Sequence, residues 1–181
     1  MRELSLHILD LIENAIRAEA SVVEVLVAAD PATDRLRIVV SDNGKGLQVS
    51  PQDAANPFYT TKQGKRTGLG LSLFRGAAEA TGGSLEIGRS AAGGVEVTVE
   101  MGLSHVDRSP LGDLAGTLSA VVCTNPGIDF RFGLRAGDRE RWIRVVELAE
   151  TLGPRGSDTL VVARRVKEEI KAELCGSGAL E

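Results

Sequence analysis

Apolar residues follow helical and strand spacings through the first hundred residues of the chain. Leu9, Ile12 and Ile16 mark one side of a helix, whereas β-branched and alternating apolar runs indicate strands. Paired glycines after the second helical stretch indicate its end. The patterns predict, in order, a helix at 3–18, strands at 22–29 and 36–41, a short helical turn at 50–55, a helix at 69–81, and strands at 84–88 and 95–101.

This order of elements determines the expected fold class. Each pair of strands has a turn between its members and is predicted to form a hairpin. An apolar sheet face has to be covered by another layer, and the two helices are the elements available. We therefore predict an α+β fold, a two-layer α/β sandwich with helices on one face of a mixed sheet.

Residues 103–181 carry a second, separate set of patterns, which predicts a small α/β subdomain. The predicted elements are a helix from Ser109-Pro110 to about 125, strands at 129–135 and 141–146, and a last helix capped by Ser157-Asp158 that ends near 174. We divide the chain into a first domain, 1–102, and this subdomain, 103–181, whose role is unknown. It either docks on the first domain or presents a surface to a partner.

Composition and charge narrow the range of partners. A net charge of −4 and an aromatic content of 3% provide neither a basic face nor a stacking platform, so we expect no nucleic-acid partner. No apolar run of about 18 residues occurs, so we expect no membrane association. Cys123 and Cys175 have neither metal-ligand nor disulfide-framework spacing, which predicts a reduced, cytoplasmic protein.

The first predicted helix also has a polar side. His7, Asp10, Asn14 and Arg17 recur at spacings of three and four residues and so share a face. On an arbitrary amphipathic helix such a row is merely solvated. An amide oxygen is, however, a hard ligand suited to Mg²⁺. Asn14 is therefore a candidate metal ligand, and Asp10, one turn earlier, is a candidate to orient or deprotonate a water or hydroxyl.

A turn rich in glycine follows the second predicted strand. Asp42 ends that strand, and Gly44 and Gly46 follow it closely. Such a sequence is usually only a turn. The functional alternative makes Asp42 the acceptor for an exocyclic amine, beside glycines that permit positive φ and close approach by a flat ring.

A second glycine-containing stretch, residues 56–73, runs from a cationic segment into the start of a helix. Thr67 is at the cap position, and Gly68 and Gly70 would let phosphate oxygens approach the free N–H groups of the helix. An ordinary loop-to-helix junction is the alternative. The polar segment 56–68 is predicted to act as a mobile lid that a ligand orders.

Four motifs in register over residues 4–102 resemble those of the GHKL superfamily, which includes DNA gyrase B, a heat-shock chaperone, sensor histidine kinases and the MutL mismatch-repair proteins. The resemblance implies the Bergerat ATP-binding fold, with ATP and Mg²⁺ as ligands. The matching stretches are Asp10-Leu11-Ile12-Glu13-Asn14-Ala15 (N box), Asp42-Asn43-Gly44-Lys45-Gly46 (first glycine box), Asn56-Pro57-Phe58 (F box) and Gly68-Leu69-Gly70-Leu71 (second glycine box).

The resemblance also implies a role for individual residues. Asn14 would bind Mg²⁺, and Asp42 would accept a hydrogen bond from adenine. Lys62 would either reach the γ-phosphate or remain a solvated cation, and Thr98 is a weak candidate for the adenine pocket. The remaining implied contacts are Gly44 and Gly46 around the base, Phe58 packed under the lid, and Thr67, Gly68, Leu69 and Gly70 against the phosphates.

Two departures from the histidine-kinase pattern affect the expected chemistry. Asp10 stands where kinases generally carry Asn and where gyrase, MutL and anti-sigma serine kinases carry Glu, so it is a candidate general base. The phosphoacceptor hairpin of a complete sensor would precede Leu4, and neither His7 nor His105 has that context. We therefore expect no self-phosphorylating sensor, and each histidine is predicted to be structural or on the surface.

The leading interpretation is a stand-alone histidine-kinase-type domain. It would bind MgATP and hydrolyse it or transfer its γ-phosphate to a separate protein, at a serine, threonine or histidine, and a homodimer is possible. The alternative is a non-catalytic regulatory module that senses ATP against ADP, similar to an anti-sigma switch between proteins.

Overall fold

The computed structural model describes residues 3–46 and 69–178. The elements are α1 (Leu4–Arg17), β1 (Val22–Asp30), β2 (Arg35–Asp42), α3 (Leu69–Glu79), β3 (Ser84–Arg89), β4 (Val95–Gly102), α4 (Leu114–Thr124), β5 (Asp129–Ala136), β6 (Arg139–Arg144), α5 (Val145–Thr151), the 3₁₀ helix η1 (Gly153–Ser157) and α6 (Thr159–Ser177). The helices and strands predicted within these ranges are found in the predicted order, and α5 and η1 are additional elements between β6 and α6.

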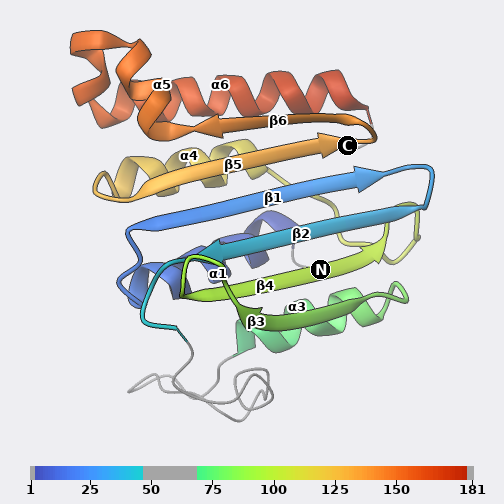
Figure 1. Cartoon of the computed structure of the whole chain (residues 1–181). Helices are drawn as coiled ribbons and strands as arrows, with labels where there is room; N and C mark the ends of the chain where they lie inside the picture. The colour runs from blue at the N-terminus through green and yellow to red at the C-terminus, as the bar shows by residue number, and fades with distance from the viewer. Residues whose placement is uncertain (1–2, 47–68, 179–181) are drawn as a thin grey trace.

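The strands form one six-stranded sheet in the order β3-β4-β2-β1-β5-β6. The two predicted hairpins, β1–β2 and β3–β4, are antiparallel as expected, and β2 joins them by pairing antiparallel with β4. β5 lies parallel to β1, with Val25 opposite Phe132, and β6 completes the sheet antiparallel to β5. The sheet is therefore mixed, as predicted (Figure 1).

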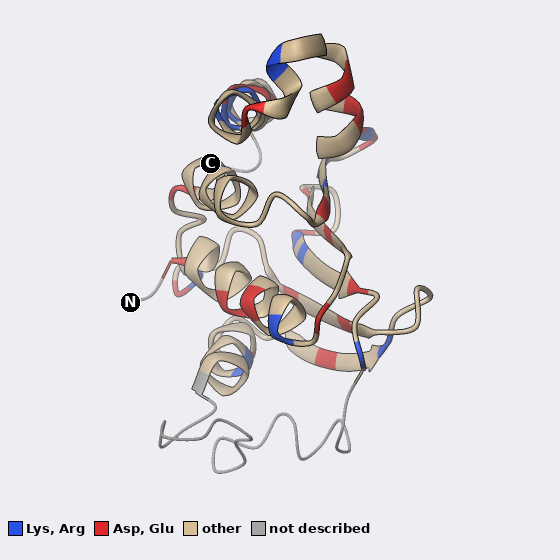
Figure 2. Cartoon of the chain, turned by 90° about the vertical axis from the view of Figure 1, so that its left-hand side faces the viewer, with Lys and Arg blue, Asp and Glu red and all other residues tan. Residues whose placement is uncertain are grey.

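Helices α1, α3, α4 and α6 lie on one face of this sheet, which confirms the two-layer α+β fold (Figure 2). Alternate residues of each strand point toward them because successive side chains of a strand alternate between faces. In β1 and β2 these inward residues, such as Val25 and Ile38, are almost completely buried. Leu4, Ile8 and Ile12 of α1 meet them from the helical layer. The core thus lies between sheet and helices.

Residues 103–178 extend the same two layers. Phe130 and Phe132 of β5 belong to the same apolar cluster as α1 and β1. The segment before α4 also holds the N-terminus of α1, because Leu4 N–H donates to Pro110 O at 2.9 Å and Ser5 N–H to Leu111 O at 3.0 Å. The division of the chain at residue 102 into two domains stays a prediction.

Two predicted boundaries in this part were wrong. Asp113, and not Ser109, caps α4, since its side chain accepts a hydrogen bond from Gly116 N–H at 2.9 Å. The strand predicted at 141–146 ends at Arg144, and α5 begins at Val145. Neighbouring β-branched residues favour a strand by propensity alone, and packing overrode that preference here. The predicted cap Asp158 is confirmed, as it accepts from Leu160 N–H at 2.9 Å.

Candidate functional site

The first half of the polar side of α1, with His7 and Asp10, faces α3. His7 is 3% exposed and stacks on Phe74 of α3, with ring centroids 4.7 Å apart, so the expected structural role of this histidine is confirmed. One turn later the half-buried Asp10 lies against the first turn of α3. A Cβ at Gly70 would stand 3.1 Å from Asp10 Oδ2 and 3.3 Å from Asp10 Cβ. The two candidate residues Asp10 and Gly70 are therefore neighbours.

Asn14 lies one further turn along α1 and is also half-buried. Its Oδ1 accepts a hydrogen bond from Arg17 Nη2 at 2.6 Å. A second nitrogen of the same guanidinium, Nη1, lies 3.4 Å from Glu13 Oε2. The amide oxygen predicted to face a metal thus faces a cationic group in this structure.

Asp42 is the last residue of β2 and is only 8% exposed. Its Oδ1 accepts hydrogen bonds from Gly44 N–H at 2.8 Å and from Val95 N–H at 3.4 Å. Its main-chain oxygen accepts from the hydroxyl of Ser90 at 2.6 Å. A nearly buried carboxylate is stable only where donors satisfy it, and the described residues supply these donors to Oδ1 alone.

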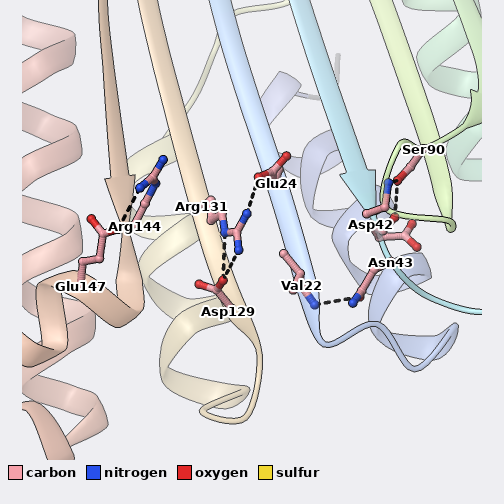
Figure 3. A network of polar contacts seen from close by, with 10 residues as sticks. Val22, Glu24, Asp42, Asn43, Ser90, Asp129, Arg131, Arg144 and Glu147 are labelled. Carbon is pink, nitrogen blue, oxygen red and sulfur yellow. Dashed lines mark hydrogen bonds and ion pairs between the residues drawn. The ribbon is translucent and has the colours of Figure 1, made fainter.

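Hydrogen bonds hold the loop after Asp42 against the end of α1 and the start of β1. Asn43 Oδ1 accepts from Ser21 N–H and Val22 N–H, both at 2.9 Å, and its amide donates to Ser21 Oγ at 2.9 Å (Figure 3). Lys45 N–H donates to Ala18 O at 2.9 Å, at the end of α1. The sequence had indicated only a turn at Asn43, although Asn is typical of turns whose side chain bonds to the main chain.

The two glycines of this loop are required for different reasons. A Cβ at Gly44 would stand 2.7 Å from Ala18 O and 2.9 Å from Ala18 Cβ, so a side chain there cannot fit against α1. Gly46 has φ of 74°, in the left-handed region that favours glycine. The loop therefore brings Asp42 close to the C-terminal end of the helix that carries Asp10 and Asn14.

Two residues that the sequence did not single out complete this arrangement, Ser90 and Gly94 in the turn between β3 and β4. Ser90 is buried and bonds to Asp42 O, and a Cβ at Gly94 would stand only 2.2 Å from Asp42 Oδ1. The only signal in the sequence was a predicted turn at 91–94 with two glycines. Figure 3 shows Ser90 beside Asp42 at the same end of the sheet.

The structure says less about the remaining predicted site residues. Several predicted features lie outside the described residues. They are the turn at 50–55, the proposed lid at 56–68, and the candidates Phe58, Lys62, Thr67 and Gly68. Leu69 is described only as the first residue of α3. Thr98 pairs with Val39 and Glu86 on the sheet face that carries no helices, opposite to the face of Asp42, so it does not join the site. The described residues include no group of three or more His, Cys, Asp or Glu able to hold a metal.

A shallow cleft lies on the other flank of α1, between Leu9 and Ile16 of that helix and Val121 of α4. None of the predicted site residues lines it. The arrangement of Asp10, Asn14, Asp42 and the three glycines therefore remains the candidate site.

None of the described helices is both long and apolar enough to cross a membrane.

Comparison with known proteins identifies the family of this chain. Residues 2–105 match the family described as histidine kinase-, DNA gyrase B-, and HSP90-like ATPase. The chain belongs to this family. The predicted GHKL membership is thereby confirmed, and the match covers α1 to β4 with the described parts of the N box and both glycine boxes.

Among the curated members of the histidine kinase-, DNA gyrase B-, and HSP90-like ATPase family, the chain resembles bacterial sensor kinases. The sensor histidine kinase ZraS of Escherichia coli (strain K12) is 30% identical over 106 residues, which cover 58% of this chain and 23% of that protein. The histidine protein kinase DivJ of Caulobacter vibrioides is 33% identical over 107 residues, or 55% of this chain and 18% of that protein. The chain thus spans less than a quarter of the length of these relatives.

Two solved structures are similar to this chain over part of its length. The nucleotide-free catalytic domain of histidine kinase ThkA is 28% identical, with a TM-score of 0.40 over 51% of this chain and 61% of that one. The MutL ATPase domain of Aquifex aeolicus complexed with ADP is 18% identical, with a TM-score of 0.41 over 76% of this chain and 60% of that one.

Proposed function

We propose that this chain binds MgATP between α1, the end of β2 and the start of α3, and that it hydrolyses ATP or transfers the γ-phosphate to a separate protein. The observation that carries this proposal is the nearly buried Asp42, 8% exposed, whose Oδ1 is satisfied within the fold. Its Oδ2 receives no donor from the described residues. An unsatisfied carboxylate oxygen in such a place is suited to an amine donor of a ligand.

Asp10 and Gly70 support the opposite end of the proposed site, where the phosphates would lie. Gly70 is in the first turn of α3, and the first turn of a helix has main-chain N–H groups with no partner inside the helix, which suits it to bind an anion. Asp10 lies against that turn, within reach of a nucleophile that approaches a phosphate bound there. A carboxylate in this position can accept the proton of a water or hydroxyl as it attacks.

Asn14 provides the donor that fits Mg²⁺. Mg²⁺ prefers oxygen ligands and commonly takes only one or two from the protein, with substrate phosphates and water as the rest. The amide oxygen of Asn14 meets this requirement, although it now accepts a hydrogen bond from Arg17. When bound, the metal would neutralise charge that develops on the phosphates.

The second part of the proposal is that the phosphate is transferred to a separate protein. The matched relatives ZraS and DivJ are described as histidine kinases, which favours a protein acceptor over hydrolysis alone. In this proposal the acceptor is a side chain of a separate molecule. His7 is buried against Phe74 and is not available for this role.

Two measurements test the function. Isothermal titration calorimetry with MgADP and with a non-hydrolysable ATP analogue measures binding, and release of ADP from MgATP measures turnover. Labelled γ-phosphate then identifies an acceptor captured in the presence of ATP, with the modified residue mapped. Absence of nucleotide binding by the folded chain would refute the proposal. Binding without turnover or transfer would instead favour the ATP-sensing switch.

A further inference from the structure

The turn between β3 and β4 encloses one side of the Asp42 carboxylate. Gly44 N–H and Val95 N–H both donate to Oδ1, at 2.8 Å and 3.4 Å. The position of a Cβ at Gly94 lies 2.2 Å from the same oxygen, 2.5 Å from Asp42 O and 2.7 Å from Gly44 N. Oδ1 is therefore held by main-chain donors and covered by the turn, which leaves Oδ2 as the oxygen without a donor among the described residues.

The turn is rigid through its own hydrogen bonds. Ser90 N–H donates to Gly94 O at 3.1 Å, and Gly93 N–H donates to Ser90 O at 3.0 Å. The Ser90 hydroxyl accepts from Ala92 N–H at 2.9 Å and donates to Asp42 O at 2.6 Å. One hydrogen bond accepted and one donated thus fix the position of the Ser90 hydroxyl. Ser90 is buried, so a water molecule cannot take the place of this hydroxyl without a cost in free energy.

Three features distinguish the contact between Ser90 and Asp42 from the contacts of an ordinary solvent-exposed turn. Ser90 and Asp42 are separated by 48 residues in the sequence, and the register of β2 with β4 brings them together, since Ser41 pairs with Glu96 next to the turn. Asp42 is a carboxylate more than nine-tenths buried, and the described residues donate to its Oδ1 alone. The absent side chain at Gly94 is what permits this approach.

We propose that Ser90 and Gly94 are positioning residues, which fix Asp42 with Oδ1 turned inward and Oδ2 turned outward and thereby determine selectivity for the base. This inference rests on the proposed nucleotide-binding function. A fixed carboxylate oxygen is only an acceptor, so it pairs with the 6-amino group of adenine and opposes the 6-oxo group of hypoxanthine. Selectivity between the two bases then depends on how firmly that oxygen is held.

The test compares the affinities of MgADP and MgIDP by calorimetry for the full-length chain and its variants. The two nucleotides share ribose, phosphates and metal, so the ratio of their affinities isolates the base. IDP also differs at the neighbouring ring nitrogen N1, but that difference is common to wild type and variant and cancels when the ratios are compared. A change that only destabilised the fold would weaken both nucleotides alike and leave the ratio unchanged.

We expect wild-type protein to prefer ADP and Ser90→Ala to lower the ADP:IDP ratio by about tenfold, the effect of misplacing one hydrogen bond. Gly94→Ala should lower the ratio further, because its Cβ takes the place of Oδ1. The matched controls are Ser84→Ala, on the exposed start of β3, and Gly88→Ala, where a Cβ meets no heavy atom within 4 Å. Both controls should keep the wild-type ratio.

The possible results separate the two proposals. If wild type binds neither nucleotide, the nucleotide-binding function and this inference both fail. If wild type prefers ADP and Ser90→Ala retains the full ratio, the function stands and the positioning role is wrong. Ser90→Ala removes a single oxygen and decides the matter even if Gly94→Ala fails to fold. A reduced ratio in Ser90→Ala with unchanged controls supports the inference.

Discussion

Asp10 on α1 lies in contact with Gly70 in the first turn of α3, where a Cβ would stand 3.1 Å from Asp10 Oδ2. The carboxylate and the turn that would receive phosphate come from segments 60 residues apart. A side chain in place of Gly70 would push on the carboxylate. The glycine thus allows Asp10 to lie close to α3, and in the proposed site it would also leave room for a phosphate.

Asp10→Asn should separate chemistry from binding. The amide cannot accept a proton from a nucleophile, so we expect turnover to fall by about a hundredfold or more, the usual scale for a general base. MgATP affinity should stay within a few fold, because ligand binding does not require that proton transfer. Steady-state ADP release and calorimetry measure the two quantities. Glu79→Gln, at the exposed end of α3, is the matched control. Wild-type turnover in Asp10→Asn would remove the general-base role.

Asp42→Asn should weaken adenine-nucleotide binding while the chain stays folded. The amide oxygen can still accept from Gly44 N–H, but its nitrogen then presents a donor where Asp42 presented Oδ2. Loss of a charge-assisted hydrogen bond of about 1.5–3 kcal/mol predicts an affinity about ten- to a hundredfold lower. Calorimetry with MgADP checks this, with Asp138→Asn in the exposed β5–β6 turn as control. Unchanged affinity in folded Asp42→Asn would exclude Asp42 from the base pocket.

Asn43→Ala should destabilise the fold. The side-chain oxygen accepts from two main-chain N–H groups, of Ser21 and Val22, and truncation leaves both without that partner. The cost of unmade hydrogen bonds predicts a loss of about 1–3 kcal/mol in the free energy of unfolding. Urea denaturation followed by circular dichroism measures it. Ser21→Ala removes only the contact of Asn43 with Ser21 Oγ and should cost less. Equal stability of Asn43→Ala and wild type would contradict this role.

A chain that ends at residue 105 should fail to form a stable monomer, although it contains the segment that matches the family. Truncation would expose the edge of β1, which pairs with β5 from Val22 to Ala29, and would remove Phe130 and Phe132 from the core. An unpaired apolar edge strand promotes aggregation. It would also remove the carbonyl groups that bond to Leu4 and Ser5 at the start of α1. Size-exclusion chromatography and urea denaturation provide the test. A monomeric fragment as stable as the full chain would support the division at residue 102.

The sequence by itself determined α1, the strands β1 to β4 and α3, together with their order. Spacings of apolar residues predicted α1, the two hairpins and α3 to within a few residues, because local periodicity decides which side of an element is buried. It also identified Asp10, Asn14, Asp42 and the glycines Gly44, Gly46 and Gly70 as candidates for one site. The family follows from these motifs, since their order and spacing are properties of the chain alone.

Only the tertiary structure decided how these segments meet. The parallel pairing of β1 with β5 joins residues about a hundred positions apart, and no local pattern specifies such a partner. The start of α5 at Val145 likewise depends on packing and not on propensity.

The contact of Asp42 with the β3–β4 turn has the same origin. Ser90 and Gly94 resemble any Ser and Gly of a hairpin turn in the sequence. The register of β2 against β4 places them on Asp42, so the long-range pairing of strands, and not the turn sequence, determines which oxygen of this carboxylate the turn covers.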